Sequence, residues 1–280
     1  MNTVLRTLIA AFATILPLSA TAAESVAFVT NLRGEVSVDG TPRPVLMSEL
    51  AKGQRIAVAK DGQLAVMYVQ SGKEYVLKGP GDYAVGDREI TANHGMSPLA
   101  RETSWRANNQ VLVKVAQTSS ASIRMRSIAP AKAELAPVLE FPTQGNVTSL
   151  QPTLRWAAAP GNAPVEVAIA LAGAEGKPVA KAKVSGTTWK VPAKLQPGVE
   201  YSWSASSGGR ELGSARFRTL EADALQAAER RRPSDKAEFT DRLLFALYLQ
   251  ELGASQEARE AWGRLAQERA DLPELASLAK

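Results

Sequence analysis

The spacing of the apolar residues changes once along this chain, and this change constrains the fold more than any other feature. Between Ser25 and Leu220, apolar and polar residues alternate in short runs, which are separated by dipeptides that suit tight turns. After Leu220 the apolar residues recur every three or four residues, as on one face of a helix. The pattern predicts a mainly β chain with a C-terminal α-helical region.

The first 23 residues have the form of a cleavable signal peptide. Arg6 precedes an apolar run over residues 8–18, which is too short to span a bilayer. Small side chains follow, and we expect cleavage after Ala22 or Ala23. The alternative is a retained N-terminal anchor. We expect an exported, periplasmic protein with no transmembrane segment in its mature chain.

Composition narrows the chemistry available to an exported chain. The sequence has no cysteine, which excludes disulfides, thiolate metal sites, cysteine nucleophiles and a lipidated cysteine. Export without disulfides fits a bacterial periplasm. The formal net charge of +5 is a mild excess, so we expect no nucleic-acid partner and at most weak attraction to anionic envelope polymers.

Residues 24–98 are predicted to form a small β domain with turns at Asp39-Gly40, Asp61-Gly62 and Ser71-Gly72. Its short motifs resemble the periplasmic FecR-type domain; they are GEVSV, LAKGQRI and DGQLAV, at residues 34–38, 50–56 and 61–66. In that family the domain often relays an outer-membrane signal to a cytoplasmic sigma factor. Because this chain shows neither the expected membrane span nor a cytoplasmic part, the resemblance implies the fold and a protein-contact role.

Residues 99–137 are predicted to be a basic connector that ends in an Ala- and Pro-rich linker. Arg101 and Arg106 flank Trp105, which is our candidate for contact with a partner or a glycan, supported by cation–π interaction. The alternative is an ordinary solvated surface.

Residues 138–220 are predicted to form a β-sandwich, with Trp156 and Trp203 in its core. Pro197-Gly198 suits a type II turn, and Tyr201 follows where its hydroxyl can bond back across the corner. This run resembles fibronectin type III and other immunoglobulin-like domains.

Residues 221–280 are predicted to form a helical hairpin. Leu225 lies in a short first helix; Asp235 and Glu238 are the expected N-cap and N3 residues of the next, which ends at Gly253. Another helix opens at Ser255, with Trp262 on its apolar face. The spacing is similar to a tetratricopeptide repeat. Because one hairpin cannot bury both faces, either it docks on the sandwich or its free face receives a partner.

No catalytic, cofactor or metal site is predicted. The single histidine, His94, lies in an expected turn, and Asp82, Asp87 and Glu89 are the only carboxylates that suggested a glycosidase. The pattern favours a non-enzymatic adaptor or sensory accessory that binds a protein partner in the cell envelope. The alternatives are a peptidoglycan- or glycan-binding protein and, less favoured, an envelope glycosidase.

Overall fold

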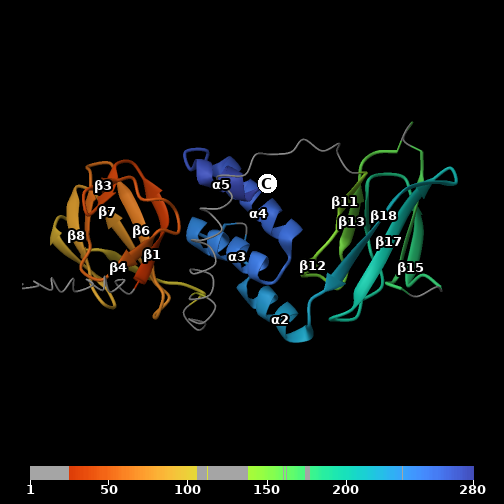
Figure 1. The fold of residues 1–280 in the computed structure, drawn as a ribbon, viewed down its shortest axis with the longest axis horizontal. Helices are drawn as coiled ribbons and strands as arrows, with labels where there is room; N and C mark the ends of the chain where they lie inside the picture. The colour runs from red at the N-terminus through yellow and green to blue at the C-terminus, as the bar shows by residue number, and fades with distance from the viewer. Residues whose placement is uncertain are drawn as a thin grey trace, which may run out of the picture.

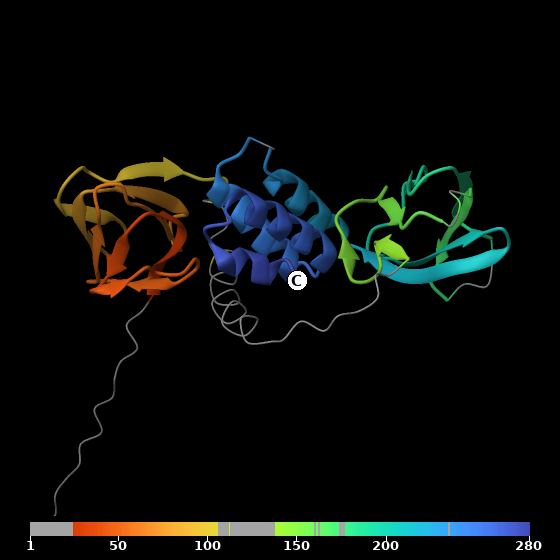
Figure 2. The same cartoon turned by 90° about the horizontal axis from the view of Figure 1, so that it is seen from above.

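The structure is a computed structural model that describes residues 25–105, 112, 138–159, 161, 163–173, 177–234 and 236–280. They form three units in a row: a first β unit, a central unit of helices, and a β-sandwich (Figure 1). The view from above shows the same order (Figure 2). The prediction of a mainly β chain with a C-terminal helical region is confirmed, and that region lies in the middle of the molecule.

The first β unit consists of two five-stranded sheets with the orders β10-β7-β6-β1-β4 and β3-β2-β5-β8-β9. Inward-facing apolar side chains such as Leu64 and Val66 are fully buried between them. The strands are β1 (Ser25–Arg33), β2 (Val36–Val38), β3 (Thr41–Pro42), β4 (Glu49–Ala51), β5 (Arg55–Val58), β6 (Gln63–Tyr68), β7 (Lys73–Lys78), β8 (Gly81–Val85), β9 (Ile90–His94) and β10 (Leu99–Glu102).

The turns of this unit use glycine for two reasons. Asp39 and Gly40 have φ values of 47° and 77°, as a tight turn between β2 and β3 requires. The chain also turns at Asp61-Gly62, where the Gly62 N–H donates to the Ala59 carbonyl at 2.8 Å, but Gly62 does not have a positive φ. An added Cβ at Gly62 would lie only 2.6 Å from the carbonyl oxygen of Glu35, so close backbone approach requires glycine here.

The first unit extends further than the sequence indicated. β10 pairs antiparallel with β7, with Leu99 opposite Val76 and Glu102 opposite Lys73. The predicted boundary at residue 98 therefore lies too early, because the backbone of residues 99–102 completes the sheet edge beside β7.

The second β unit is a sandwich of two sheets, with the orders β11-β13-β16 and β12-β18-β17-β14-β15. Trp156 and Trp203 face each other across its core, with ring centroids 6.4 Å apart, as predicted. The strands are β11 (Leu139–Phe141), β12 (Asn146–Val147), β13 (Thr153–Trp156), β14 (Val165–Leu171), β15 (Ala180–Val184), β16 (Thr188–Lys190), β17 (Glu200–Ser207) and β18 (Arg210–Thr219).

The corner before β17 has the predicted geometry. Gly198 takes a φ of 71°, which suits the third position of a type II turn after Pro197. The Tyr201 hydroxyl accepts a hydrogen bond from the backbone N–H of Gln196 at 2.9 Å. This is the bond that defines a tyrosine corner, and it holds the turn against the strand that follows.

The C-terminal region contains α2 (Ala222–Arg231), α3 (Phe239–Glu251), α4 (Ser255–Glu268) and α5 (Pro273–Leu278). α3 and α4 pack as the predicted hairpin, and Gly253, with φ 69°, follows the end of α3. Glu238 is the N-cap of α3 and not its N3 residue, while Asp235 lies outside the described residues. Pro273 begins a further helix, because its fixed φ suits a first helical turn.

The helices attach differently to the two β units. Buried apolar residues of the first β unit and of the helices form one continuous core. The sandwich has a core of its own. α3 is buried almost all round, because α4 covers one side and the first β unit contacts another. The hairpin thus has both faces occupied within the chain. Within the described ranges, no helix is long and apolar enough to span a membrane.

Candidate functional site

The predicted contact residue Trp105 is wholly buried, so its assignment as a surface contact is wrong. Its ring packs edge to face against Tyr248 of α3, with centroids 5.7 Å apart. The cation beside it is Arg231, whose guanidinium carbon lies 5.8 Å from the ring centroid. The expected partner Arg106 lies outside the described residues. Trp105 therefore joins the first β unit to the helices.

Arg101 belongs to the same joint. Its guanidinium forms ion pairs with Glu74 of β7 at 2.6 Å and with Asp241 of α3 at 2.7 Å. The buried Glu74 carboxylate also accepts hydrogen bonds from the hydroxyls of Thr30 and Thr240. With these partners, Arg101 is committed to holding the units together and not to gripping an external ligand.

The carboxylates considered for glycoside hydrolysis do not converge. In the register of the β8–β9 hairpin, Asp82 lies opposite His94 at one end. Asp87 and Glu89 lie at the turn of the hairpin, beyond Val85. Asp82 and His94 line a shallow cavity on the sheet surface together with Arg55. In the parts of the chain that the structure describes, no group of three or more His, Asp or Glu side chains could hold a metal ion.

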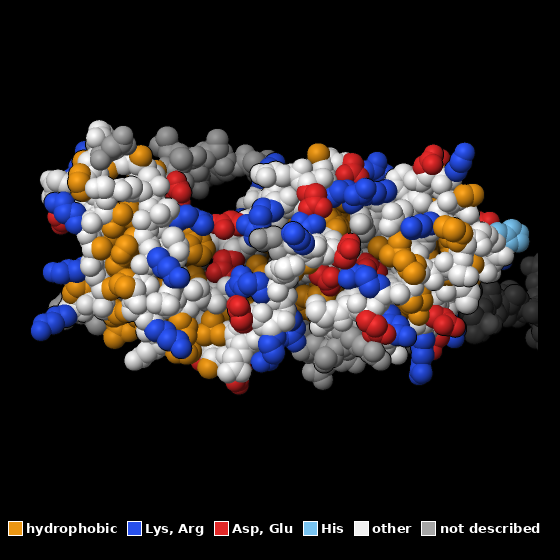
Figure 3. All heavy atoms as spheres, turned by 180° about the vertical axis from the view of Figure 1, so that it is seen from behind, with side chains coloured by type: hydrophobic (Ala, Val, Ile, Leu, Met, Phe, Trp, Pro, Cys, Tyr) orange, Lys and Arg blue, Asp and Glu red, His pale blue; other side chains and the backbone are white. Residues whose placement is uncertain are grey.

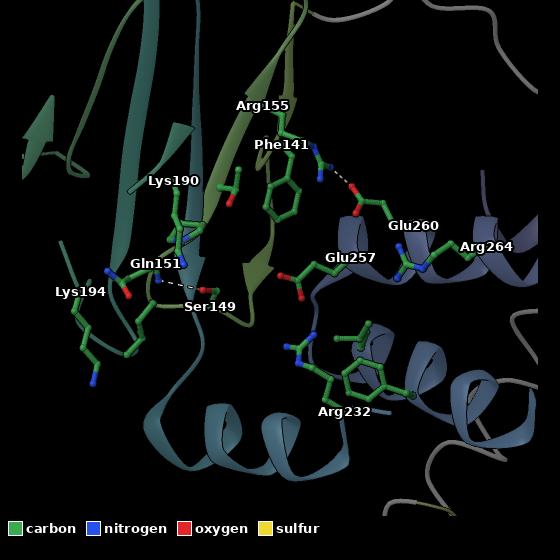
Figure 4. A pocket seen from close by; sticks show the side chains of 15 residues that line it. Phe141, Ser149, Gln151, Arg155, Lys190, Lys194, Arg232, Glu257, Glu260 and Arg264 are labelled. Atoms are coloured by element: carbon green, nitrogen blue, oxygen red, sulfur yellow. Dashed lines mark hydrogen bonds and ion pairs between the residues drawn. The ribbon is translucent and has the colours of Figure 1, made fainter. Parts of the chain in front are cut away.

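A cavity lies where the sandwich meets the helices, and we call it the junction cavity (Figure 4). Its volume is about 520 Å³, within the range of small-ligand pockets. Phe141, Arg155 and Lys190 line the sandwich side, from β11, β13 and β16. Glu257 on α4 and Phe245 on α3 line the helical side, so the cavity exists only because two units dock.

The junction cavity is predominantly basic. Two acidic side chains, Glu257 and Glu260, line it. Its five basic side chains are Arg155, Lys190, Lys194, Arg232 and Arg264. Seen from behind, basic side chains with acidic ones among them gather over the middle of the molecule (Figure 3). The excess favours an anionic ligand.

Two of the arginines are held by groups of the protein itself. Arg155 pairs with Glu260 across the joint, as the dashed line in Figure 4 marks. Arg232 donates to the hydroxyl of Thr148 at 3.0 Å and pairs with Glu229 at 3.1 Å. These contacts fix the cavity walls relative to each other.

The other three basic side chains are exposed and available. Lys190 and Lys194 come from the sandwich, and Arg264 comes from α4 (Figure 4). None of the three has a hydrogen-bond or ion-pair partner among the described residues. They can therefore neutralise anionic groups of a ligand without breaking an internal contact.

Glu257 is the carboxylate set deepest in this joint. It accepts the backbone N–H of Thr148 at 3.1 Å. Burial raises the pKa of Glu257, against the opposing effect of the Thr148 hydrogen bonds and of the nearby Arg232. The raised pKa means that burial disfavours the charged form of Glu257, and the nearby Arg232 cation reduces this penalty.

A smaller cavity of about 340 Å³ continues across the helices. It shares Arg232, Phe245 and Arg264 with the junction cavity and extends to Arg242 and Leu265. We call the two together the joint groove.

The charged residues of this groove were not predicted from the sequence, because each one resembles an ordinary exposed charge in its own segment. The visible signal was the run from Arg230 to Arg232 just before Pro233, between two helices. No known protein-family model matches the chain, and no curated protein is similar to it in sequence. The interpretation of the groove therefore depends on its own residues.

Proposed function

We propose that this chain is a non-enzymatic periplasmic adaptor or sensory accessory that binds an envelope protein through an anionic segment seated in the junction cavity. In this proposal the signal peptide exports it, and its units are a FecR-like domain, an immunoglobulin-like sandwich and a tetratricopeptide-like helical hairpin. The sandwich and the helices both line the junction cavity, so it exists only where these two units dock.

One observation carries the proposal. Lys190, Lys194 and Arg264 line one cavity from two units, are exposed, and have no side-chain partner in the described part of the chain. They outnumber the two acidic side chains of the cavity, and their lack of internal partners leaves them available to a ligand that touches several at once.

The proposal is tested by crosslinking in the periplasm and recovery of the protein with its partners. Recovery of the specific partner with the variant K190E/K194E/R264E should fall by about tenfold or more, because repulsion replaces attraction at three positions. The control K181E/R210E/R216E changes the net charge equally at exposed sandwich positions away from the cavity, and it should retain the partner.

If the two variants recover equal amounts of the partner, the cavity is not the binding site. Sedimentation with purified sacculi tests the alternative function. If the wild type pellets with sacculi and the cavity variant does not, the ligand is peptidoglycan and the protein-adaptor proposal is wrong.

A further inference from the structure

The joint groove has charge at both ends and an apolar floor between them. Lys190 lies at the sandwich end and Arg264 lies on the helical side, whereas Arg242 beyond it is ion-paired with Glu268. The partly exposed Leu150 supplies apolar surface to the groove, beside Phe141 and Phe245, which are 7% and 6% exposed. Arginines stand over both rings, with Arg232 5.5 Å from the Phe245 centroid. A matching ligand has separated negative charges with an apolar group between them.

The two acidic side chains in the groove select among anions. Glu257 and Glu260 lie beside the basic residues, so they repel a ligand that carries charge along its whole length, such as a polyphosphate. A peptide differs, because its carboxylates are separate from its backbone N–H groups. Those N–H groups can donate to the groove carboxylates while the peptide's carboxylates contact lysine and arginine.

The position of the groove adds a consequence for the domains. The sandwich does not share the apolar core of the helices, and the contacts across this joint include a hydrogen bond from the Asn146 N–H to the Gly253 carbonyl at 3.0 Å. A ligand that touches Lys190 on one side and Arg264 on the other adds contacts across the joint. Its binding therefore stabilises the docked arrangement.

From these features, and on the basis of the proposed function, we infer that the ligand is an extended acidic peptide with a large apolar side chain between its carboxylates. It binds across the sandwich–helix joint and holds the sandwich in place. A partner presents it as an exposed acidic segment.

Synthetic peptides test the inference directly on the full mature protein. A fluorescent Glu-Glu-Phe-Glu-Glu peptide should bind, and its affinity should fall by about tenfold or more when glutamine replaces every glutamate or when glycine replaces the phenylalanine. Inorganic polyphosphate at the same charge concentration should compete poorly.

Protein variants then locate the bound peptide. K190A/K194A on the sandwich and R264A on α4 should each weaken binding several-fold, whereas K181A/R216A should not. Bound peptide should also slow hydrogen exchange at the Asn146 and Thr148 amides, which donate across the joint. A folded circular-dichroism spectrum for each variant excludes misfolding as the cause.

The outcomes separate the inference from the function on which it depends. If recovery of the periplasmic partner depends on the cavity but no acidic peptide binds, or polyphosphate competes as well as the peptide, the inference is wrong and the proposed function stands. The same holds if the peptide binds without slowing exchange at Asn146 and Thr148, because the ligand would not stabilise the joint. If neither partner nor peptide depends on the cavity, both are wrong.

Discussion

The helical unit meets its two neighbours through joints of opposite character. Towards the first β unit, the joint is an apolar core in which Trp105 packs on Tyr248, reinforced by the buried Glu74–Arg101 pair. Towards the sandwich, the units are connected by hydrogen bonds and ion pairs, such as Asn146 Nδ2 to the Leu252 carbonyl at 2.7 Å, around a cavity.

The two joints therefore differ in how easily a ligand can shift them. Apolar area removed from water gives the first joint a large stabilisation, so the first β unit and the helices should behave as one body. Hydrogen bonds exchanged with water contribute only about 1 kcal/mol each, so the second joint is the one that a ligand can shift. The basic groove lies at this second joint.

Removing Trp105 should break the apolar joint most severely. Trp105→Ala leaves a large void between β10 and α3 and should lower the free energy of unfolding by about 3–5 kcal/mol. Urea denaturation combined with hydrogen exchange would show the loss in the first unit and the helices while the sandwich stays protected. Trp105→Phe should cost much less, because the indole N–H has no partner among the described residues. An unchanged stability of Trp105→Ala would contradict its place in this core.

Arg101→Ala should destabilise the same body by about 3 kcal/mol, because it leaves the buried Glu74 charge without its cation. Adding Glu74→Gln should recover part of the loss by removing that charge. Arg216→Ala, an exposed arginine on β18, is the control and should stay within about 0.5 kcal/mol. If the two single variants unfold alike, the ion pair does not hold this joint.

The polar joint can be opened without touching either core. An added Cβ at Gly145 would lie 2.9 Å from the carbonyl oxygen of Gly253, in the turn after α3. Gly209 has nearly the same φ, 77° against 75°, but nothing lies within 4 Å of its added Cβ. Gly145→Ala and Gly209→Ala should therefore share a backbone cost of about 1–2 kcal/mol.

Only Gly145→Ala should also loosen the joint, with faster exchange at the Asn146 amide and a longer average distance between sandwich and helices by small-angle scattering. The same scattering curve for both variants would mean that the joint does not depend on this contact.

Local patterns were sufficient to predict much of this fold. The Tyr201 corner, the inward-facing Trp156 and Trp203, and the α3–α4 hairpin all depend on residues close in sequence, where turn chemistry and periodicity act directly. The joints do not. The Arg101–Asp241 pair links residues 140 positions apart.

The groove is still less visible in sequence, because it combines charges from distant segments. Neither Lys190 nor Arg264 carries a signal in its own segment that it will face the other unit. The prediction that Trp105 lies at the surface failed for the same reason, because its burial depends on contact with Tyr248 of a helix far along the chain.

The smallest expected effect concerns Glu257 and the pH response of the polar joint. Burial raises its pKa, so the docked joint binds more protons than the undocked one at pH values between the ordinary carboxyl range, near 4.5, and the raised value. Docking should therefore weaken as pH rises through that window and stay constant above it. Glu257→Gln keeps an oxygen that can accept the Thr148 N–H but has no proton to exchange, so it should abolish this dependence.

At neutral pH the same substitution leaves the groove more positive, and it should tighten acidic-peptide binding by about two- to fivefold. Glu229→Gln, which removes an exposed partner of Arg232 outside the cavity, should change the affinity less. Hydrogen exchange at Thr148 across pH, with peptide titrations by fluorescence anisotropy, measures both effects. If docking of Glu257→Gln weakens with rising pH as steeply as that of the wild type, the titrating group is not Glu257.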